Sequence, residues 1–409
     1  MKLTRAGVRS GQTPRTEPPE TQHEPAAMLR TPECADEFIP LFDPRAQYQR
    51  LRAEIDDRIL RVMANGAFVN GPEVDELEDA LCRETGAQAC VACANGTDAL
   101  VMSLLASGIG PGDAVFVPAF TYVATAGAVR LVGATPVFCD VVEETANLDA
   151  DDLVRRITRV RRSSTLTARA VLPVDLYGLP ANYAEIHDVA QAHDLLVIAD
   201  AAQSMGGARH GEPVGGLARL TCVSFFPTKP LGCAGDGGAI FTDDLHLATR
   251  LRRLRTHGTD ASRTAIEVGM NNRLDTLQAA ILLAKLPHLA SERAHREHLA
   301  CRYDTSLGDV VQPAPREPGC QSAWALYTIR SDHRDAIRHA LEARRIASAV
   351  YYHAPIHLHP GYKVFGEGPG SLPASERLAE RVLSLPLTAE MSEAHVDRVA
   401  QTVRDALCV

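Results

Sequence analysis

The sequence lacks any long hydrophobic run and any excess of positive charge. Its longest apolar stretches, such as Leu195–Ile198 and Ala279–Ala284, are far shorter than the roughly 20 residues that a membrane-spanning helix needs. The 42 basic side chains are outnumbered by 51 acidic ones, and no stripe of Lys and Arg with interleaved aromatic residues is present. These absences argue against a transmembrane protein and against nucleic acid as a main partner.

The sequence also lacks a secretion signal and a cysteine pattern typical of a metal site. The first residues, MKLTRAGVRSGQTPRTEPPE, contain no apolar core. Ten cysteines are scattered through 409 residues, and Cys90 and Cys93 form the only C-x-x-C, with no second pair nearby. We therefore expect reduced, mostly buried thiols and a cytoplasmic location.

Several familiar catalytic motifs are missing as well. The sequence contains no G-x-S-x-G nucleophile elbow, no Walker lysine after a glycine-rich loop and no H-E-x-x-H zinc motif. The glycines of GIGPGD alternate, but Pro111 and the strand pattern that follows favour a helix-to-strand turn over a dinucleotide-binding loop. Any chemistry must therefore come from less general patterns.

The N-terminal segment differs in composition from the rest of the chain. Residues 1–37 are rich in Pro, Glu, Thr, Gln and Arg and show no repeating apolar face, which is typical of a flexible extension. After Ile39, a helical pattern ends at Gly66, and we expect its apolar positions to form one buried face: Leu51, Ile55, Ile59, Leu60 and Met63. A folded domain is predicted to begin here.

Short Val-, Ile- and Leu-rich runs then alternate with amphipathic helical segments. The predicted strands are 89–94, 114–119, 135–140, 169–178, 195–200, 221–226 and 237–244, and the predicted helices between them are 72–86, 97–108, 125–133 and 183–194. This alternation predicts an α/β fold whose sheet is buried on both faces, with ligands at the carboxyl ends of its strands.

A long helical stretch interrupted at Pro287 follows and is predicted to lead to a second, smaller lobe. The later residues combine a strand pattern at 325–330 with helical patterns at 333–346 and 392–407. We expect a large α/β domain over residues 38–288 and a smaller α+β domain over residues 289–409.

Asp200 is the first candidate functional residue. It ends the apolar run that begins at Leu195, and a carboxylate at the end of a buried strand lies where an α/β sheet binds ligands. Burial there would require a cationic partner. A simple cap or turn residue is the alternative.

Lys229 is the second candidate, within SFFPTKPLGCAGDGG. A lysine among aromatic, Pro and Gly residues, with no carboxylate beside it in sequence, favours a lowered pKa and Schiff-base chemistry. Its alternative is a surface lysine on a turn. The glycines that follow suggest backbone passing close to a ligand, and they are Gly232, Gly235, Gly237 and Gly238.

The third candidate is Asn95-Gly96-Thr97, between a predicted strand and a predicted helix. Gly96 and Thr97 could present backbone N–H groups and a hydroxyl to a phosphate at the positive end of the helix dipole. Helix capping by Asn95 or Thr97 explains the same residues equally well.

Nine segments of the chain together resemble a known family. They read NGTDAL, PAFTYVATAGAV, GATPVFCDV, DLYGLP, IADAAQSMGG, SFFPTKPLGCAGDGG, LRTHG, GMNNRLDTLQAA and LSLPL. From about Ile39 to the C-terminus, their order and spacing are similar to those of the DegT-type sugar aminotransferases, pyridoxal-phosphate enzymes of fold type I. The resemblance implies a large α/β/α sandwich with a mostly parallel sheet and a smaller C-terminal α+β domain.

The resemblance also implies roles for individual residues. Lys229 would hold pyridoxal 5'-phosphate and later move the proton between substrate and cofactor carbons. Asp200 would pair with the pyridine nitrogen and keep it protonated. The remaining implied cofactor contacts are Gln203 on the ring hydroxyl, Tyr122 and Ala202 on the two ring faces, and Gly96, Thr97 and Ser224 on the phosphate.

Active sites of such enzymes lie at a dimer interface, so the resemblance implies a homodimer. Asn271 would reach the cofactor phosphate of the neighbouring subunit, and Arg273 would point at its substrate. An ion pair with Asp275 or another nearby acid is the structural alternative for Arg273.

The substrate is the least constrained feature. The segment that begins at Tyr351 usually reads His-Tyr-Pro-x-Pro-Leu-His in the family, so Tyr351 and His353 are substitutions that leave the exact sugar open, with Tyr352 and His353 expected near its ring. The three histidines of residues 353–359 do not indicate a metal site, because prolines break any helix that could align them and no carboxylate accompanies them.

The reaction implied is transfer of an amino group from glutamate to a keto nucleotide sugar. Two segments, SFFPTKPLGCAGDGG and NNRLDTLQAAILLAKL, look most like the enzymes that aminate UDP-2-acetamido-2-deoxy-3-oxo-glucuronate. The alternatives are amination of a 4-keto-6-deoxy nucleotide sugar, a pyridoxal-dependent sugar dehydratase and a non-catalytic sugar sensor. Lys229 disfavours the dehydratase, since relatives of that kind replace it with histidine, and the set Asp200, Gln203 and Lys229 disfavours the sensor.

Overall fold

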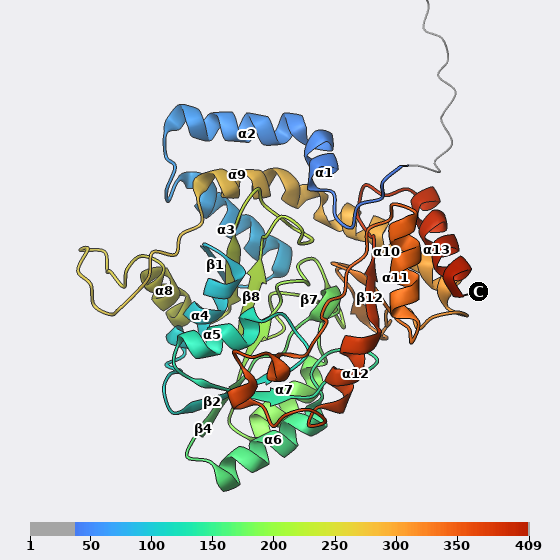
Figure 1. Cartoon of the computed structure of the whole chain (residues 1–409). Coiled ribbons are helices and arrows are strands. Elements are labelled where there is room, and N and C mark those ends of the chain that lie inside the picture. The colour runs from blue at the N-terminus through green and yellow to red at the C-terminus, as the bar shows by residue number, and fades with distance from the viewer. Residues whose placement is uncertain (1–36, 408–409) are drawn as a thin grey trace, which may run out of the picture. The chain divides into compact units, whose positions relative to one another are not determined.

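The computed structural model of the protein describes residues 37–407, and Figure 1 shows the arrangement of their helices and strands. The predicted flexible extension therefore lies, apart from Glu37, outside the described residues. None of the helices within residues 37–407 combines the length and the apolar character needed to cross a bilayer.

A seven-stranded sheet forms the centre of the larger part of the chain. Its strands, in spatial order, are β1 (Ala89–Cys93), β9 (Gly238–Thr242), β8 (Leu220–Ser224), β5 (Leu196–Asp200), β4 (Thr167–Val171), β2 (Asp113–Pro118) and β3 (Thr135–Cys139). Strand β9 pairs antiparallel with both of its neighbours, and every other pair is parallel. The carboxyl ends of β1, β8 and β5 consequently meet at one edge of the sheet.

Helices cover both faces of this sheet. One face packs against α3 (Pro72–Thr85), α6 (Ala150–Ser163), α7 (Tyr183–Ala192) and α9 (Thr276–Lys285), and the other against α4 (Gly96–Ala106), α5 (Ala124–Leu131) and α8 (Leu245–Leu254). Alternate residues of β2 enter the two cores: Phe116 contributes to the first and Val115 to the second. The predicted α/β/α architecture with a mostly parallel sheet is confirmed (Figure 1).

Two of these helices, α6 and α8, have no counterpart in the sequence prediction. Arginines occupy much of each helix, and only a narrow apolar stripe enters the core, formed in α6 by Leu153 and Ile157. The predicted strand 169–178 is also too long, because β4 ends at Val171 and a short 3₁₀ turn (Leu176–Gly178) follows.

The first helical pattern divides into α1 (Pro44–Arg50) and α2 (Arg52–Asn65), and Gly66 ends α2 in the left-handed conformation with φ 72°. The predicted buried face of α2 is partly wrong. Ile55 packs against α9, whereas Leu60 and Met63 are 66% and 54% exposed. Both residues point away from α9, because their positions along the helix are out of phase with Leu51 and Ile55.

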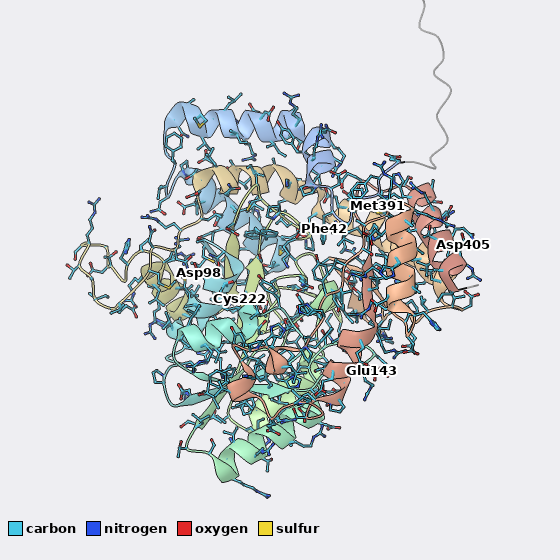
Figure 2. The ribbon with its side chains drawn as sticks, in the orientation of Figure 1. Phe42, Asp98, Glu143, Cys222, Met391 and Asp405 are labelled. Atoms are coloured by element: carbon cyan, nitrogen blue, oxygen red, sulfur yellow. The ribbon has the colours of Figure 1, made fainter. Side chains whose placement is uncertain are left out.

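The C-terminal residues build a separate core. Its helices are α10 (Leu289–Leu307), α11 (Arg334–Ala343) and α13 (Glu393–Leu407), and its antiparallel strands are β11 (Tyr327–Arg330) and β12 (Val382–Leu385). Helix α12 (Pro373–Arg381) packs in a different apolar cluster, through Leu378 and Ala379. Met391, labelled in Figure 2, packs in this core, and so does Ile39 from the start of the described chain. The predicted interruption at Pro287 is a 3₁₀ turn (Leu286–His288) between α9 and α10. The exact division at residues 288 and 289 stays a prediction.

A small third sheet and two short turns complete the fold. The sheet joins β6 (Ala208–Arg209) to β7 (Glu212–Pro213) and β10 (Cys320–Gln321). The turns are 3₁₀ segments at Ile356–Leu358 and Lys363–Phe365.

Two leucines of α8 provide a matched test of this packing. Leu251 is fully buried beneath the sheet, whereas Leu245 on the same helix is 57% exposed. We expect Leu251→Ala to lower the free energy of unfolding by about 2–5 kcal/mol, through lost apolar burial and a residual cavity. Leu245→Ala should change it by no more than about 0.5 kcal/mol. Chemical denaturation measures both, and equal effects would contradict the described orientation of α8.

Candidate active site

Three strand ends of the large sheet supply the core of the candidate site. Asp200 is the last residue of β5, Ser224 is the last residue of β8, and Gly96 begins α4 shortly after β1. Lys229 lies in the connection between β8 and β9. Because β1, β5 and β8 run in the same direction, these residues gather at the carboxyl edge of the sheet, as the sequence predicts.

These residues line one cavity of about 420 Å³. Nine of the predicted site residues contribute to its wall: Gly96, Thr97, Tyr122, Asp200, Ala202, Gln203, Ser224, Lys229 and Tyr352. Among the described residues that line the cavity, Lys229 is the only cation, and it shares the wall with Asp200 and Asp236. A volume of this size suits a small ligand held by a few polar groups.

Asp200 is a buried carboxylate with few compensating partners. The Thr125 hydroxyl donates a 2.7 Å hydrogen bond to its Oδ2, and the Ala202 backbone N–H lies 3.3 Å from its Oδ1. Burial raises the pKa of Asp200, and these two bonds and the positive charge of Lys229 oppose that rise. Asp200 is therefore a buried strand-end carboxylate that faces the cavity, which goes beyond the role of a simple cap.

Lys229 is partly buried in the wall of the cavity. Burial lowers the pKa of its amine, and the negative charge of Asp200 is the opposing influence. A lowered pKa increases the fraction of neutral amine, which is the form that attacks a carbonyl. The alternative of a surface lysine on a turn does not fit this position.

The start of α4 contributes Asn95, Gly96 and Thr97 to the wall of the cavity. Asn95 caps the helix, because its side chain accepts a 2.9 Å hydrogen bond from the Asp98 backbone N–H. Gly96 and Thr97 occupy the first turn, where backbone N–H groups have no partner within the helix. A Cβ at Gly96 would lie 2.8 Å from the Ser224 Cβ, so only glycine allows this close approach. Thr97 and Ser224, which both carry hydroxyls, line the cavity beside this helix N-terminus, a combination that suits an anion.

Aromatic side chains form the opposite wall. The Tyr352 ring centroid lies 6.2 Å from that of Tyr122 and 6.1 Å from that of Phe120. Burial raises the pKa of Tyr352, and the nearby Gln203 side chain opposes that rise. Tyr122 is 57% exposed, so its ring face is available to a planar ligand.

Three predicted site residues do not line this cavity. Asn271 is exposed, Arg273 is partly exposed, and His353 is exposed with its ring 6.0 Å from that of His359. Within residues 37–407, no ion pair joins Arg273 to Asp275. The cavity of the described chain therefore brings together nine of the predicted site residues and does not include these three.

The sequence did not single out two other residues of the site, Thr125 and Phe42, and it marked Tyr351 only as a substitution. Thr125, Phe42 and Tyr351 contact Asp200 or line the cavity. Phe42, labelled in Figure 2, packs with Tyr351 in the same apolar cluster. Thr125 lies within PAFTYVATAGAV, in the first turn of α5, and a hydroxyl at that position is a weak signal. Phe42 gives no local signal, because it is far in sequence from the other residues that line the cavity.

The glycines after Lys229 serve packing between backbone segments. None of Gly232, Gly235, Gly237 and Gly238 lines the cavity, so the expected contact with a ligand is not seen. A Cβ at Gly238 would lie 2.6 Å from the Asn95 carbonyl carbon. This glycine therefore allows β9 to pack against the start of α4.

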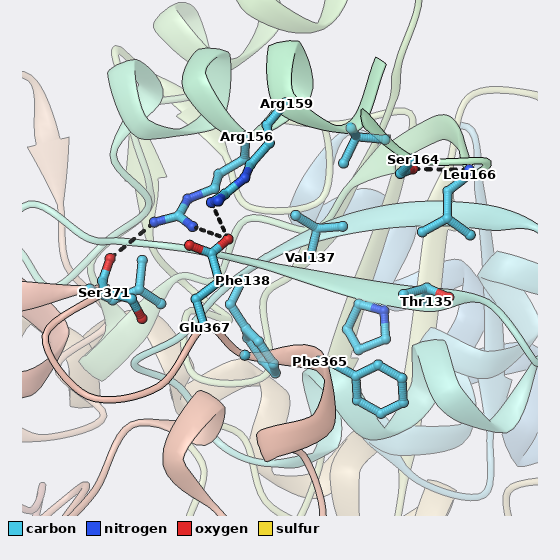
Figure 3. A pocket seen from close by; sticks show the side chains of 14 residues that line it. Thr135, Val137, Phe138, Arg156, Arg159, Ser164, Leu166, Phe365, Glu367 and Ser371 are labelled. Atoms are coloured by element: carbon cyan, nitrogen blue, oxygen red, sulfur yellow. Dashed lines mark hydrogen bonds and ion pairs between the residues drawn. The ribbon is translucent and has the colours of Figure 1, made fainter. Parts of the chain in front are cut away.

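A second cavity, of about 240 Å³, lies along β3 at the edge of the sheet (Figure 3). Arg156 and Arg159 both pair there with Glu367, and Arg156 also donates a 3.1 Å hydrogen bond to the Ser371 carbonyl. None of the predicted site residues lines it. Since its arginines are already paired with a carboxylate, we assign no ligand to it.

Several known proteins with similar sequences are named as aminotransferases, and two relatives of 38% identity have regulatory or sensory names. The profile of the DegT/DnrJ/EryC1/StrS aminotransferase family matches residues 49–404. The UDP-2-acetamido-2-deoxy-3-oxo-D-glucuronate aminotransferase of Pseudomonas aeruginosa is 43% identical over 88% of this chain and 98% of its own. The dTDP-3-amino-3,4,6-trideoxy-alpha-D-glucose transaminase of Streptomyces venezuelae is 38% identical over 90% of this chain and 96% of its own.

Solved structures agree with this assignment. A DegT DnrJ EryC1 StrS aminotransferase from Brucella abortus superposes with a TM-score of 0.89 at 44% identity, covering 90% of this chain and 99% of its own. The sugar aminotransferase Spr1654 from Streptococcus pneumoniae, in its PLP-form, has a TM-score of 0.83 at 26% identity and covers 90% and 98%.

Pyridoxal 5'-phosphate is the cofactor of this fold, and the cavity fits it chemically. A helix N-terminus with hydroxyls suits the phosphate, a buried carboxylate suits the pyridine nitrogen, and an amine of lowered pKa suits the aldehyde. Matching sequence, fold and cavity lead to one conclusion: the chain is a sugar aminotransferase of the DegT/DnrJ/EryC1/StrS family.

Proposed function

We propose that this aminotransferase moves an amino group from glutamate to the 3-keto group of UDP-2-acetamido-2-deoxy-3-oxo-glucuronate. The observation that carries the reaction class is the single cavity in which Lys229, Asp200 and the start of α4 meet. The choice of acceptor is supported by the similarity to the Pseudomonas aeruginosa aminotransferase that is named for this sugar. Amination of a deoxy nucleotide sugar is the second candidate, supported by the Streptomyces venezuelae relative.

The bound cofactor supplies an electron sink for the carbon that loses its proton. Asp200 would keep the pyridine nitrogen protonated, and Thr125, which donates to its Oδ2, would hold this carboxylate in place. Gly96, Thr97 and Ser224 would bind the phosphate. Gln203 would donate to the ring hydroxyl, and Tyr122 and Ala202 would pack on the ring faces.

Lys229 would perform two tasks in turn. Its amine would first hold the cofactor, and after release by the amino donor it would accept and return a proton as a general base and acid. Its lowered pKa favours both tasks, because a neutral amine is required for attack and for proton abstraction. The aromatic wall of Tyr122 and Tyr352 would restrict water near these atoms.

The acceptor carries negative charge that this chain's own cavity does not neutralise. A diphosphate and a sugar carboxylate need cationic donors, and Lys229 is the only cation among the described lining residues. Arg273 lies outside the cavity and is partly exposed, as is expected of a side chain that serves a second subunit. We therefore retain a homodimer in which Asn271 reaches the partner's phosphate and Arg273 reaches its substrate.

Exposed apolar residues support a protein contact beside these side chains. Ile266 and Val268, in the loop that precedes Asn271, are 52% and 94% exposed. Large apolar side chains gathered on a surface mark interaction sites. His353, with the adjacent Tyr352, would contribute to the sugar end of the site. The cytoplasmic location stays a prediction.

Replacing Lys229 tests the reaction class. Lys229→Ala removes the amine, and Lys229→Arg retains a positive charge without a usable nucleophile. We expect both variants to lose turnover by several orders of magnitude, together with the visible absorbance of lysine-bound cofactor. Absorbance spectra and amino transfer from glutamate measure this. Turnover at the wild-type rate in either variant would remove Lys229 from its role.

Replacing Arg273 tests the acceptor. Arg273→Lys should lower kcat/KM for the 3-oxo uronate by about tenfold or more, because a charge-assisted bidentate bond is lost. The kcat/KM for a neutral 4-oxo-6-deoxy nucleotide sugar should change by no more than about twofold, because this sugar has no carboxylate and makes no such bond in the wild type. A wild-type preference for the neutral sugar, or equal losses for both, would leave only the broader nucleotide-sugar activity.

Mixing two inactive chains tests the shared site. If Asn271 serves the neighbouring subunit, an Asn271→Ala chain and a Lys229→Ala chain should regain activity when their subunits exchange. One of the two sites in such a heterodimer contains both intact groups, so up to about half of its sites can work. Native mass spectrometry confirms exchange, and the absence of recovery after exchange would place both residues in the same chain's site.

A further inference from the structure

Tyr177 holds an unusual backbone conformation beside the active site. It follows β4 in the turn Leu176–Gly178, its side chain is buried, and its φ is 61°. The left-handed region is sparsely populated for bulky residues that are not glycine. Strain of this kind persists only where the surrounding structure holds it, and it is frequent at functional sites.

Backbone hydrogen bonds hold this turn from two sides. The Tyr177 N–H donates to Gln203 Oε1 at 2.6 Å, and the Tyr177 carbonyl accepts from the Leu326 N–H at 3.3 Å. The Gly178 carbonyl accepts from the Ala323 N–H at 2.8 Å. The turn is therefore fixed between the cofactor side of the cavity and the chain that leads into β11.

The first of these bonds orients Gln203. Its Oε1 is occupied by the Tyr177 N–H, so the amide nitrogen is the part of the side chain left for the cavity. Tyr352 lines the same cavity, and the Gln203 side chain opposes the rise that burial causes in the pKa of its phenol, as a donating amide nitrogen would. A donor is also what a ring oxygen of the cofactor would require.

The Tyr177 side chain fixes the opposite wall. Its hydroxyl donates to the carbonyl of Tyr351, and Tyr351 and Tyr352 both line the cavity. Burial raises the pKa of Tyr177, so the phenol stays protonated and remains a donor at neutral pH. Tyr177 itself does not line the cavity.

We propose that Tyr177 is a positioning residue for the acceptor sugar. Its backbone sets the donor end of Gln203, and its hydroxyl holds the segment that presents Tyr352. Tyr177 thereby fixes the distance between Gln203, on the cofactor side of the cavity, and Tyr352, on the sugar side. It does so without contacting either ligand. The inference rests on the aminotransferase activity, and it depends on the proposed function only for the choice of acceptor.

Tyr177→Phe tests the hydroxyl with little change in volume. The variant keeps the backbone bond to Gln203 and loses only the bond to the Tyr351 carbonyl. We expect the KM for the acceptor to rise by about three- to tenfold, the range that one lost hydrogen bond produces. The absorbance of bound cofactor and the rate of its single-turnover reaction with glutamate should stay within about twofold.

Tyr303→Phe is the matched control. Tyr303 is fully buried, and its hydroxyl donates to a backbone carbonyl, that of Pro386, at 2.9 Å. It lies in the C-terminal core and does not line the cavity. This variant should lose stability to a similar extent and leave the acceptor KM unchanged. A rise in KM in both variants would show that Tyr177 acts only through general stability, which would overturn the proposal.

The Tyr177→Phe substitution is also tested in a chain that carries Tyr352→Phe. If Tyr177 acts through the position of Tyr352, the increase in KM caused by Tyr177→Phe should largely disappear in a Tyr352→Phe chain. Full additivity of the two effects would overturn the proposal, as would an equal slowing of the glutamate and acceptor reactions. If the wild type uses the neutral keto sugar instead of the uronate, the same comparison is made with that sugar. Failure of the proposed acceptor therefore remains distinguishable from failure of this inference.

Discussion

The buried carboxylate of Asp200 is the constraint on which the site depends. Removing a carboxylate from water is costly, and here only the Thr125 hydroxyl, the Ala202 N–H and the charge of Lys229 offset that cost. Burial moves the pKa of the acid upward and that of the amine downward, because it disfavours the charged form of each group. A protonated ring nitrogen placed against Asp200 would supply the missing cationic partner, and cofactor binding would then relieve the cost of burial.

The direction of the strands brings these groups together. Asp200 and Ser224 end two parallel neighbours, β5 and β8, and α4 starts at the end of β1, which runs the same way. Strand β9 returns between β8 and β1 in the opposite direction, so the connection that carries Lys229 must turn at the same edge. An all-parallel order would instead require a helical crossover between these strands. The single antiparallel strand thus allows a short connection to deliver the lysine beside the helix start.

Local patterns in the sequence predicted the parts of the site that lie at strand ends. Asp200 follows an apolar run, Gly96 and Thr97 precede a helix, and Lys229 stands among residues unusual for a surface turn, so each has a signal of its own. Thr125 has only a weak signal and Tyr177 has none, because their roles come from contacts with Asp200 and Tyr351, which are distant in the chain. The same limit applies to α6 and α8, where arginine-rich surfaces hide a narrow apolar stripe. Leu60 shows the opposite failure, since an apolar residue within a helix need not face the chain's own core.

The charge of the cavity is compatible with the role proposed for Arg273, which lies outside it. A cation fixed beside Asp200 and Lys229 in the same chain would compete with the ring nitrogen for the carboxylate, and it would lower the pKa of the lysine further by repulsion. A cation contributed from outside the pocket can neutralise the phosphates and the sugar carboxylate at a greater distance from that pair. The partly exposed position of Arg273 and the apolar side chains Ile266 and Val268 near it are consistent with such a division. Assembly of two chains would then add the anion-binding half of the site without disturbing the acid and amine that perform the chemistry.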